Sequence, residues 1–351
     1  MDIPYVLITG GAGFIGTNVA RSYLAEGQPV QVFDNLSRAG VEQNVAELQR
    51  AFPDHVIFTN ADVRDRSAVR RAVAGAKAVY HFAAQVAVTT SLEDPVSDLE
   101  TNLIGTVNVL EAIRHSVFRP PMLFTSTNKV YGKLNSISLE ESDTRYQPAN
   151  EGVATRGVSE EQPLEFLSPY GCSKGSADQY VLDYAKSYGL FATVFRMSCI
   201  YGPYQMGSED QGWVAHFLRR ALKNNAITIY GDGKQVRDLL FVSDLVNAMR
   251  LAVSKIGEIS GEAFNIGGGF ENSSSLLDVI SELNRLTANQ VRVHRGPERL
   301  GDQRWYVSDI SRFKTRLRWS PKVNVSEGLR QLHDWYVSHA VASPQAEVQF
   351  A

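Results

Sequence analysis

The chain has 351 residues, of which 44% are hydrophobic and 21% are charged, and its formal net charge is −3. This composition is that of an ordinary globular protein, long enough for one large domain or two closely joined ones. It excludes an overall basic field that would attract nucleic acid or a membrane surface, and no apolar run approaches the ~18 residues of a membrane-spanning helix. We therefore expect neither nucleic acid nor a membrane as a partner.

The sequence also indicates a compartment. The N-terminal residues have no basic flank and no cleavage site, so we expect no signal peptide. The two cysteines, Cys172 and Cys199, do not form a metal-ligand pattern, and we predict no metal site. Their small number favours a reducing cytoplasm, with a disulfide between them as the alternative.

Short apolar runs rich in β-branched and aromatic residues alternate with helical stretches over the first 200 residues. Helices are predicted over 17–26, 99–115 and 173–188, and strands over 5–9, 30–33, 56–59, 78–82, 122–126 and 192–196. Such alternation predicts a Rossmann-type α/β fold with a doubly wound parallel sheet. The near-continuous apolar strands agree with a sheet that is buried on both faces.

The alternation loosens after Arg196, where Gly, Pro and polar residues interrupt it. We predict a first domain over 1–197 and a smaller α/β substrate-binding region over 198–234 and 259–340. Residues 235–258 are expected to return to the first domain, and 341–351 to form a tail. The polar stretch 133–168 has no clear period and predicts a lid or binding loop; a tolerated surface insertion is an equal alternative.

A glycine-rich turn, Gly10-Gly11-Ala12-Gly13-Phe14-Ile15-Gly16, follows the first predicted strand and opens the first predicted helix. In this context Gly10 permits the tight turn, Gly13 lets the backbone approach a pyrophosphate, and Gly16 lets the helix and strand pack closely. The helix N-terminus adds free N–H groups and a partial positive charge. The motif predicts a dinucleotide site; the alternative is a glycine-rich turn without a ligand.

Asp34 ends the second predicted strand, within the ~20-residue spacing expected of an acid that binds a ribose diol. A carboxylate there repels a 2′-phosphate, so the sequence favours NAD over NADP. Arg38 complicates this prediction because a nearby arginine can accept that phosphate.

The ends of the next two strands supply further candidates. Asp62 could accept a hydrogen bond from the adenine amine while Val63 covers the ring, or Asp62 could simply cap the strand. Ala83 and Ala84 are small enough to let the backbone and a cofactor approach closely. His81 is interpreted as a packed structural histidine.

Tyr170 and Lys174 are separated by one helical turn and therefore share a helix face, and Pro169 suits the start of that helix. A lysine ammonium near a phenol favours the phenolate and lowers the pKa of the phenol from about 10. Tyr170 could then exchange a proton with a substrate hydroxyl near neutral pH. The same lysine could hold the nicotinamide ribose.

A third group is needed to orient the substrate hydroxyl. Thr125-Ser126-Thr127 ends the fifth predicted strand, at the carboxyl edge where open α/β sheets bind ligands. Thr127 is the preferred candidate and Ser126 the alternative. Hydroxyls that only cap a strand end are the rival interpretation.

With these residues in place, the sequence resembles the extended short-chain dehydrogenase/reductase family over about residues 4 to 340. The resemblance rests on motifs spread along the chain: Thr9 to Gly16, Val130-Tyr131-Gly132, Ser168 to Lys174, Gly231-Asp232-Gly233, Arg237-Asp238 and Phe264-Asn265-Ile266-Gly267. It implies an NAD-binding first domain, a catalytic triad of Thr127, Tyr170 and Lys174, and assembly as a homodimer or homotetramer.

The site residues that follow from motif and resemblance fall into two groups. The predicted cofactor-binding residues are Gly10, Gly13, Phe14, Ile15, Gly16, Asp34, Asn35, Arg38, Asp62, Val63, Ala83, Ala84, Tyr170 and Lys174. The predicted substrate-binding residues are Gln85, Asn128, Gln211, Trp213, Arg237 and Arg304. The resemblance places Arg237 and Arg304 where such enzymes hold the nucleotide diphosphate, a role that suits the bidentate arginine fork.

A narrower resemblance is to the CDP-paratose 2-epimerases, also called CDP-tyvelose epimerases. It rests on Ser126 to Gly132, Pro163-Leu164-Glu165-Phe166, Asp210 to Val214, Gly233 to Asp238 and Asp302-Gln303-Arg304. Sugar-nucleotide 4,6-dehydratases carry Asp then Glu after the catalytic threonine, whereas this chain has Asn128 and Lys129. Met197 departs from the narrower pattern, since tyvelose-type enzymes tend to have His at that position.

The resulting hypothesis is a redox epimerase that uses tightly bound NAD and inverts C2 of a nucleotide-diphosphate sugar through a keto sugar. A UDP-sugar 4-epimerase with the same machinery is the nearest alternative. A non-catalytic NAD(H)-sensing protein and a net reductase are the others.

Overall fold

The computed structural model describes residues 4–288, 290–299 and 302–342. Its centre is a seven-stranded sheet in which every pair of neighbours is parallel. The strands lie across the sheet in the order β12 (Ala263–Ile266), β8 (Ala192–Met197), β5 (Met122–Thr127), β4 (Ala76–His81), β1 (Tyr5–Thr9), β2 (Val30–Asp34) and β3 (Val56–Asn60). The order reverses between β1 and β4, as in a doubly wound fold, so the predicted fold class is confirmed.

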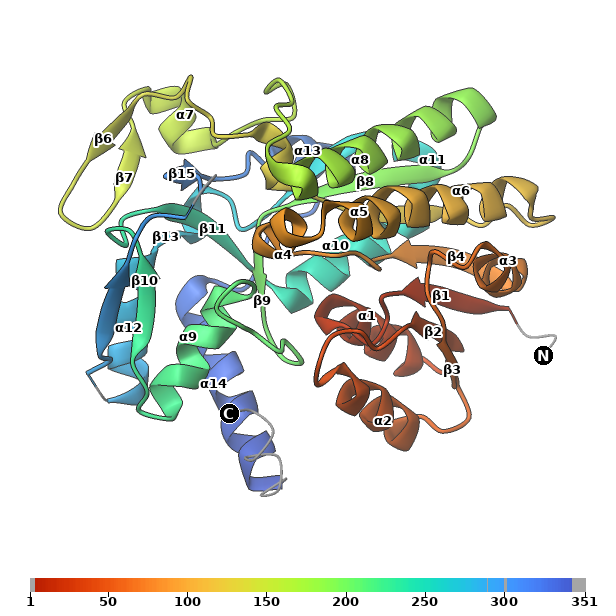
Figure 1. The fold of residues 1–351 in the computed structure, drawn as a ribbon, viewed down its shortest axis with the longest axis horizontal. Coiled ribbons are helices and arrows are strands. Elements are labelled where there is room, and N and C mark those ends of the chain that lie inside the picture. The colour runs from red at the N-terminus through yellow and green to blue at the C-terminus, as the bar shows by residue number, and fades with distance from the viewer. Residues whose placement is uncertain (1–3, 289, 300–301, 343–351) are drawn as a thin grey trace.

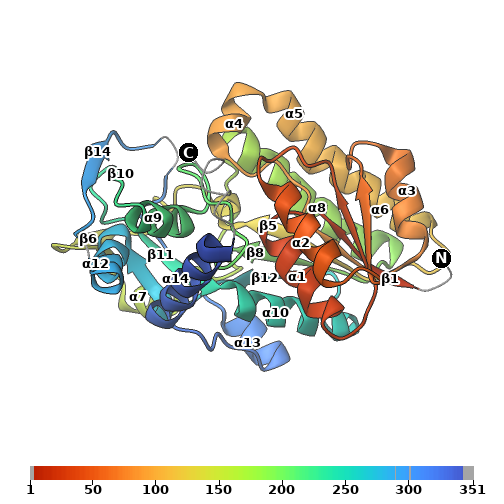
Figure 2. The same ribbon diagram turned by 90° about the horizontal axis from the view of Figure 1, so that it is seen from below.

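Helices cover both faces of this sheet (Figures 1 and 2). One face packs against α1 (Phe14–Leu24), α2 (Val41–Ala51), α10 (Val242–Ser254), α11 (Ile256–Ile259) and α13 (Ser311–Leu317). The other face packs against α3 (Arg66–Ala74), α6 (Gly105–His115) and α8 (Ser168–Tyr188). Burial on both sides explains why the strands are apolar along their whole length.

Local turn chemistry moves two helix starts earlier than predicted. Helix α1 begins at Phe14 instead of residue 17, because Gly13 ends the glycine turn in an extended conformation and serves as the N-cap. Helix α8 begins at Ser168 instead of residue 173, with Pro169 in its first turn, where the missing N–H costs nothing.

The predicted helix 99–115 is wrong in its form. The chain makes two short helices, α4 (Val88–Glu93) and α5 (Pro95–Leu99), then a π-helical turn, η1 (Glu100–Ile104), before α6 begins. The wider turn carries the buried Asn102, whose side-chain amide donates to Ser173 Oγ (3.0 Å) and Asp98 Oδ1 (3.1 Å). Hydrophobic periodicity does not reveal such a bulge.

A second, smaller region packs beside the carboxyl edge of the sheet (Figure 1). It has its own core between strands and helices. Its elements are β9 (Cys199–Tyr201), β10 (Ile227–Tyr230), β11 (Val236–Phe241), β13 (Ser273–Ser275), β14 (Val293–Gly296), β15 (Trp305–Tyr306), α9 (Trp213–Leu222), α12 (Leu276–Thr287), α14 (Val325–Ala342) and the short turn η3 (Phe270–Asn272).

The chain crosses between the two regions more often than predicted. Helix α10 returns to the sheet as expected for 235–258, but β11, within the same stretch, pairs with β9, β13 and β15 of the smaller region. Strand β12 and helix α13, which fall in the predicted substrate-binding stretch 259–340, belong to the main sheet and its core. Most of the predicted tail, 341–351, lies outside the described residues.

The polar stretch 133–168 has structure of its own. It forms a hairpin of β6 (Leu139–Glu141) and β7 (Tyr146–Pro148) and a short helix, α7 (Glu151–Arg156). Its residue Val158 is buried and bridges Ser308, and Glu160 accepts a hydrogen bond from the Asn265 amide (2.7 Å). The stretch thus contacts both strand β12 of the main sheet and the segment around Ser308, and within the described chain it contributes no lining to the large cavity described below.

A buried ion pair fixes α8 on the sheet. Arg196 on β8 donates from Nε and Nη2 to the two carboxylate oxygens of Asp178 on α8, both at 2.9 Å, and both side chains are buried. Arg196 also donates to the Tyr131 hydroxyl (3.2 Å), which in turn donates to Asn265 Oδ1 (2.7 Å). Every charge in this cluster has a partner, which is the condition under which buried ion pairs are tolerated.

Replacing Asp178 with Ala leaves the Arg196 charge buried without its carboxylate. We expect the free energy of unfolding to fall by about 3–5 kcal/mol, measured by urea denaturation. The matched control is Asp334→Ala, which removes one partner of an exposed pair with Arg330 on α14 and should change stability far less. Equal losses in the two variants would contradict a stabilising role for the buried pair.

Candidate active site

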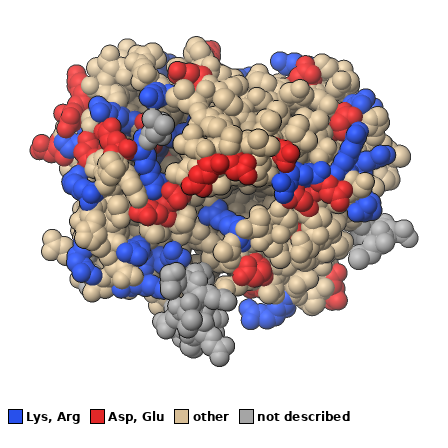
Figure 3. Space-filling view, viewed as in Figure 1, with Lys and Arg blue, Asp and Glu red and all other residues tan. Residues whose placement is uncertain are grey.

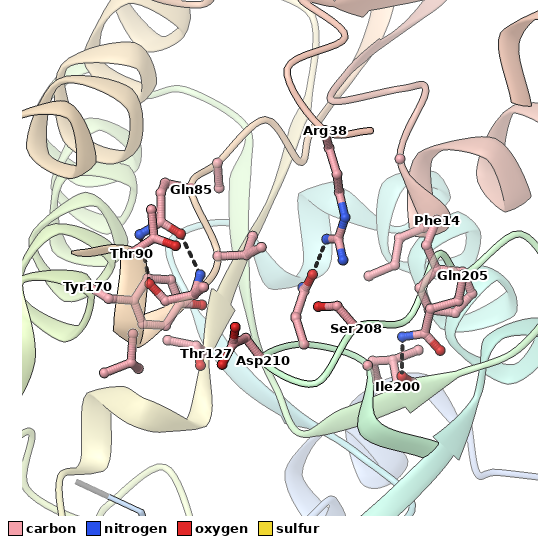
Figure 4. A pocket seen from close by; sticks show the side chains of 18 of the residues that line it. Phe14, Arg38, Gln85, Thr90, Thr127, Tyr170, Ile200, Gln205, Ser208 and Asp210 are labelled. Carbon is pink, nitrogen blue, oxygen red and sulfur yellow. Dashed lines mark hydrogen bonds between the residues drawn. The ribbon is translucent and has the colours of Figure 1, made fainter. Parts of the chain in front are cut away.

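A cavity of about 930 Å³ lies at the carboxyl ends of the strands, between the sheet and the smaller region. Its lining includes residues that follow β1, β2, β3, β4, β5 and β8 and residues from α9, β10 and β11. Figure 4 shows Tyr170, Thr127 and Gln85 at one end, and Phe14, Arg38 and Gln205 at the other. The cavity therefore joins the predicted acid/base group to the predicted dinucleotide turn in one space.

The glycine turn leaves no room for side chains at Gly10 and Gly16. Gly10 has a positive φ of 67°, and a Cβ there would lie 2.6 Å from the Ala83 amide nitrogen. A Cβ on Gly16 would lie 2.5 Å from the Gly10 carbonyl oxygen, while one on Gly13 would meet only that oxygen, at 3.2 Å. The cradle thus fits a pyrophosphate approaching the backbone at Gly13 and the start of α1.

Asp34 and its neighbours line the cavity beside this turn, as do Phe14, Ile15, Asn35 and Arg38. The Asp34 carboxylate accepts from the backbone N–H groups of Ala12 (3.0 Å) and Leu36 (2.9 Å). Burial raises the pKa of Asp34, and these two hydrogen bonds partly offset the effect. Asp34 is held rigidly in a position suited to a ribose diol.

Asp62 and Val63 also line the cavity. Asp62 accepts from the Asn35 side chain (2.8 Å) and from the backbone and guanidinium of Arg64, which hold the pKa of Asp62 at about 2. Asp62 therefore holds the turn after β3 and also faces the cavity. A structural role at the strand end and contact with a bound adenine do not exclude each other. Val63 is buried against Gly105.

Ala83 and Ala84 lie after β4 and line the cavity, whereas His81 does not. The His81 ring is fully buried between the hydroxyls of Thr9 (2.6 Å) and Thr106 (3.0 Å), and burial lowers its pKa to about 3. His81 is a structural residue, as the sequence predicted.

Thr127, Tyr170 and Lys174 all line the cavity, and Figure 4 shows Thr127 and Tyr170 at the end away from Phe14. Thr127 caps the turn η2 (Asn128–Tyr131) by accepting from the Lys129 amide (3.2 Å), and its hydroxyl donates to Asn128 Oδ1 (3.5 Å). The Lys174 ammonium donates to the Thr125 carbonyl (2.6 Å) and lies 4.2 Å from the centre of the Phe124 ring. All three side chains are at least nine-tenths buried.

The expected effect of Lys174 on Tyr170 is wrong for the cofactor-free protein. Burial raises the pKa of Tyr170 to about 12; the bond with Thr127 lowers it and the charge of Asp98 raises it further. Burial also lowers the pKa of Lys174 to about 7, although Asp178 and Asp98 oppose the shift. Desolvation dominates at Tyr170, and the Lys174 ammonium donates to the Thr125 carbonyl.

A buried polar network supports this end of the cavity. Asp98 accepts from Ser173 on α8 and from the side chains of Asn102 (3.1 Å) and Gln85 (3.0 Å). The amide nitrogen of Gln85 also donates to the Ala87 carbonyl (2.8 Å), so both of its N–H groups are used. Gln85 lines the cavity, and only its side-chain oxygen, which already accepts from the Ala87 backbone N–H, has a lone pair left for a ligand.

Cations gather around Asp302 on the opposite wall. Arg237 donates to Asp302 Oδ1 (2.7 Å) and to the Val236 carbonyl (2.7 Å), and the Lys129 ammonium lies 3.3 Å from the same carboxylate oxygen. Both cations line the cavity, together with Asn128 and Trp213, and the fixed guanidinium of Arg237 has further N–H groups to offer a phosphate.

The expectation for Arg304 is not met. Arg304 does not line the cavity; its side chain is 60% exposed, 3.5 Å from Glu298 and over the Tyr146 ring. The cation that the structure places there instead is Arg299, which pairs with Asp210 (3.2 Å) and stacks on Tyr230. Arg304 precedes β15 and is exposed, and no motif in the sequence marks Arg299.

Gln211 lines the cavity as part of a segment, residues 202–212, that we term the strap. The strap joins β9 to α9. Arg38 donates to the Gln211 side-chain oxygen and to the Met206 carbonyl (3.1 Å), so its guanidinium is already committed to protein acceptors. These contacts direct the Arg38 guanidinium towards the strap.

Two side chains in the lining, Gln205 and Gln235, carry no signal in the sequence, whereas Ser126 is the alternative to Thr127 that the sequence offered. Ser126 Oγ, Gln205 Oε1 and Gln235 Oε1 are buried and have no hydrogen-bond partner within the described residues. The amide nitrogens of Gln205 and Gln235 donate to the carbonyls of Ile200 (3.1 Å) and Tyr230 (2.8 Å), which fixes their oxygens as acceptors. Buried acceptors without partners are what a polar ligand would satisfy.

Other chemistry is not evident in the described part of the chain. No cluster of three or more His, Cys, Asp or Glu side chains there could hold a metal ion. Cys172 and Cys199 are both free thiols. None of the helices in the described ranges is both long and apolar enough to cross a membrane, and Lys/Arg and Asp/Glu are interspersed over the face shown in Figure 3.

Comparison with known proteins agrees with this geometry. The model of the NAD dependent epimerase/dehydratase family matches residues 6–267. The CDP-paratose 2-epimerase of Salmonella typhi is 41% identical over 337 residues, which are 94% of this chain and 98% of that protein.

Solved structures extend the likeness to the whole fold. The UDP-glucose 4-epimerase of Thermus thermophilus in complex with NAD has a TM-score of 0.79 and 33% identity, covering 95% of this chain and 99% of that one. The UDP-glucuronic acid 4-epimerase of Bacillus cereus, in complex with UDP-glucuronic acid and NAD, has a TM-score of 0.81 and 27% identity, with the same coverage.

The pKa of Lys174 has a consequence for stability. The pKa of Lys174 is about 7 in the folded protein and about 10.5 in the unfolded chain. Below pH 7 the amine is charged in both states, and burying the charge lowers the free energy of unfolding by its full amount. This loss shrinks as pH rises from 7 towards 10.5, because the folded protein then holds the amine neutral. Relative to Lys174→Met, the cofactor-free wild type should therefore gain stability between pH 7 and 9.5, measured by urea unfolding. A difference between wild type and Lys174→Met that stays constant over this pH range would contradict the expectation.

Proposed function

The chain belongs to the NAD dependent epimerase/dehydratase family and is an enzyme of the nucleotide-sugar epimerase type that uses NAD, and on this premise we propose that it inverts C2 of a CDP-linked sugar. The observation that carries the proposal is the single cavity that contains both the glycine cradle and Tyr170. The relationship to the CDP-paratose 2-epimerase, which extends over nearly all of both chains, supports the choice of base and carbon.

The residues present fit the cofactor. The glycine cradle at Gly10, Gly13 and Gly16 would hold its pyrophosphate, and Asp34 its adenosine ribose. When bound, NAD+ supplies the acceptor for a hydride from the sugar carbon and brings a formal positive charge that favours the Tyr170 phenolate.

We assign the proton transfer to Tyr170. Its oxygen takes the proton of the sugar hydroxyl as the carbon is oxidised and returns it after the keto sugar has turned, so that no net oxidation occurs. The Thr127 hydroxyl, which lines the same cavity as the phenol, would orient the reacting C–O group. Lys174, next to Phe124 and the Thr125 carbonyl, fixes the helix turn that carries Tyr170.

The opposite wall would anchor the nucleotide while the sugar turns. Arg237, Lys129 and Arg299 supply positive charge for the diphosphate, and Trp213 and Tyr230 supply aromatic surface. Holding the diphosphate keeps the intermediate in place without holding the sugar ring itself. Met197 lines the same space, where its apolar side chain would shape the sugar pocket.

The residues after Thr127 favour epimerisation over dehydration. Elimination of water needs an acid and a base in addition to the tyrosine. The Asn128 amide donates to Gln303 (2.9 Å), and the Lys129 ammonium lies against Asp302, so neither position supplies a free carboxylate.

We also propose that the protein acts in the cytoplasm as a homodimer or homotetramer. The free thiols suit a reducing compartment. Helices α5 and α8 and the turn η1 lie together and expose large hydrophobic side chains, which supports pairing through this face. These are Val96, Leu99, Ile104, Tyr180 and Tyr188, each at least 45% exposed.

The substrate assignment predicts the fate of an isotopic label. CDP-paratose carrying deuterium at C2 should be converted to its C2 epimer with the deuterium retained, because the hydride moves to the cofactor and back within one site. Mass spectrometry and NMR of the product measure both changes. Rapid exchange of the label with solvent would point to simple deprotonation instead.

The matched comparison is a UDP-sugar deuterated at C4 under the same conditions. The proposal expects slow or undetectable inversion there. A reversed preference would replace it by the 4-epimerase alternative while leaving the site assignment intact.

The role of Tyr170 is tested by Tyr170→Phe. Removal of the phenolic oxygen should lower kcat by about 10²- to 10⁴-fold, since that is the usual contribution of a positioned acid/base group. Bound NAD, measured after release from the protein, should stay at the wild-type level. Tyr180→Phe, which changes an exposed tyrosine of the same helix, should leave kcat unchanged; equal activity of both variants would remove Tyr170 from the mechanism.

A further inference from the structure

The strap, residues 202–212, lies between the two halves of the cavity wall. Most of its residues from Tyr204 onward line the cavity, and the segment covers the space between the glycine turn and the substrate side. Figure 4 shows Ser208 and Asp210 of the strap between Phe14 and Tyr170. A ligand that reaches from the glycine cradle to Tyr170 would therefore lie against the strap.

The beginning of the strap is attached to the cofactor side by packed contacts. Asn18 on α1 donates to the Pro203 carbonyl (2.9 Å), and the Tyr204 hydroxyl donates to Glu47 on α2 (2.8 Å). Tyr204 is buried, with the Arg21 guanidinium 5.2 Å from the centre of its ring. These contacts anchor the first residues of the strap to the helices that flank the glycine turn.

The later part of the strap is attached differently. Arg38, four residues after Asp34, reaches across the cavity to the Met206 carbonyl (3.1 Å) and the Gln211 side chain. On the substrate side, Arg299 donates to the Glu209 carbonyl (3.1 Å) and pairs with Asp210. Polar contacts from the two sides thus hold the covering residues, and such contacts can break and re-form without unpacking a core.

Arg38 is suited to act as a latch. It is half-buried and lines the cavity, and burial lowers its pKa while leaving it charged. Charge-assisted hydrogen bonds in a site that excludes water are stronger than those on an open surface. Because the fork bonds to two positions of the strap, 206 and 211, it fixes the direction of the segment as well as its distance.

We propose that Arg38 is a positioning residue that latches the strap over bound NAD, so that the cofactor and the keto sugar stay in the cavity between the two half-reactions. The inference rests on the proposed cofactor site. It gives a structural reason why an epimerase that regenerates NAD in every cycle need not exchange it. It also assigns to Arg38 a role in cofactor retention that is separate from recognition of the adenosine ribose.

The test measures loss of cofactor instead of activity. Wild type and Arg38→Ala are purified with NAD bound and moved into buffer containing an NAD-degrading glycohydrolase, and the NAD remaining on the protein is followed with time. The variant should lose NAD about tenfold faster or more, as expected for the loss of charge-assisted hydrogen bonds. Amide hydrogen exchange should rise over residues 206–212 and stay unchanged in the strands of the sheet.

Two further variants make the test specific. Gln211→Ala removes the partner of the same contact and should also speed NAD loss, and the double variant should lose NAD no faster than Arg38→Ala alone, since the two groups act as a pair. Arg50→Ala, at the exposed end of α2, is the control and should behave as wild type. Gln211→Ala carries the test if Arg38→Ala does not fold.

The outcomes are distinct. Unchanged NAD loss in Arg38→Ala and Gln211→Ala, with faster exchange over 206–212, would overturn the latch because the strap would then move without releasing the cofactor. A wild-type protein that binds no NAD would overturn the proposed cofactor site itself. A wild type that holds NAD but fails to epimerise a nucleotide sugar would count against the proposed reaction and leave the latch standing.

Discussion

The contact between the Lys174 ammonium and the Thr125 carbonyl joins the helix that carries Tyr170 to the strand that carries Thr127. The buried Lys174 ammonium loses its hydration, which disfavours its charged form. The Phe124 ring and the charges of Asp178 and Asp98 partly offset this cost. The same Asp178 pairs with Arg196 and holds α8 on β8. One connected set of buried charges therefore fixes the distance between the acid/base group and the sheet edge.

Because Tyr170 is held in place by these contacts, the cofactor-binding and nucleotide-binding groups can come from segments that are distant in the sequence. Once Tyr170 is fixed, the cavity needs only a cofactor cradle on one side and an anchor for the nucleotide on the other, and these come from opposite ends of the chain. The glycine turn supplies backbone N–H groups, while the wall around Asp302 supplies cations. The strap bridges the two, so the closed cavity is a product of both regions and of neither alone.

The sequence predicted those parts of the site that depend on local geometry. The glycine turn, Asp34 at a strand end, and Tyr170 one helical turn from Lys174 are set by spacing along one element, and each lines the cavity. The ionisation of Tyr170 was misjudged because spacing gives proximity but does not measure desolvation. Gln85 reaches the cavity, but its side-chain NH2 group donates to the Ala87 carbonyl and to Asp98. No sequence motif reveals these two hydrogen bonds.

The sequence alone determined the parallel sheet, the dinucleotide turn, the acid/base pair and the family, because these follow from periodicity and from residues close in the chain. Only the tertiary structure decided that Arg299 and not Arg304 faces the cavity, that β12 and α13 complete the first domain, and that Arg38 reaches the strap 168 to 173 residues away. Those outcomes depend on which surfaces pack together after folding, and burial, side-chain direction and pairing between remote segments leave no local pattern in the chain.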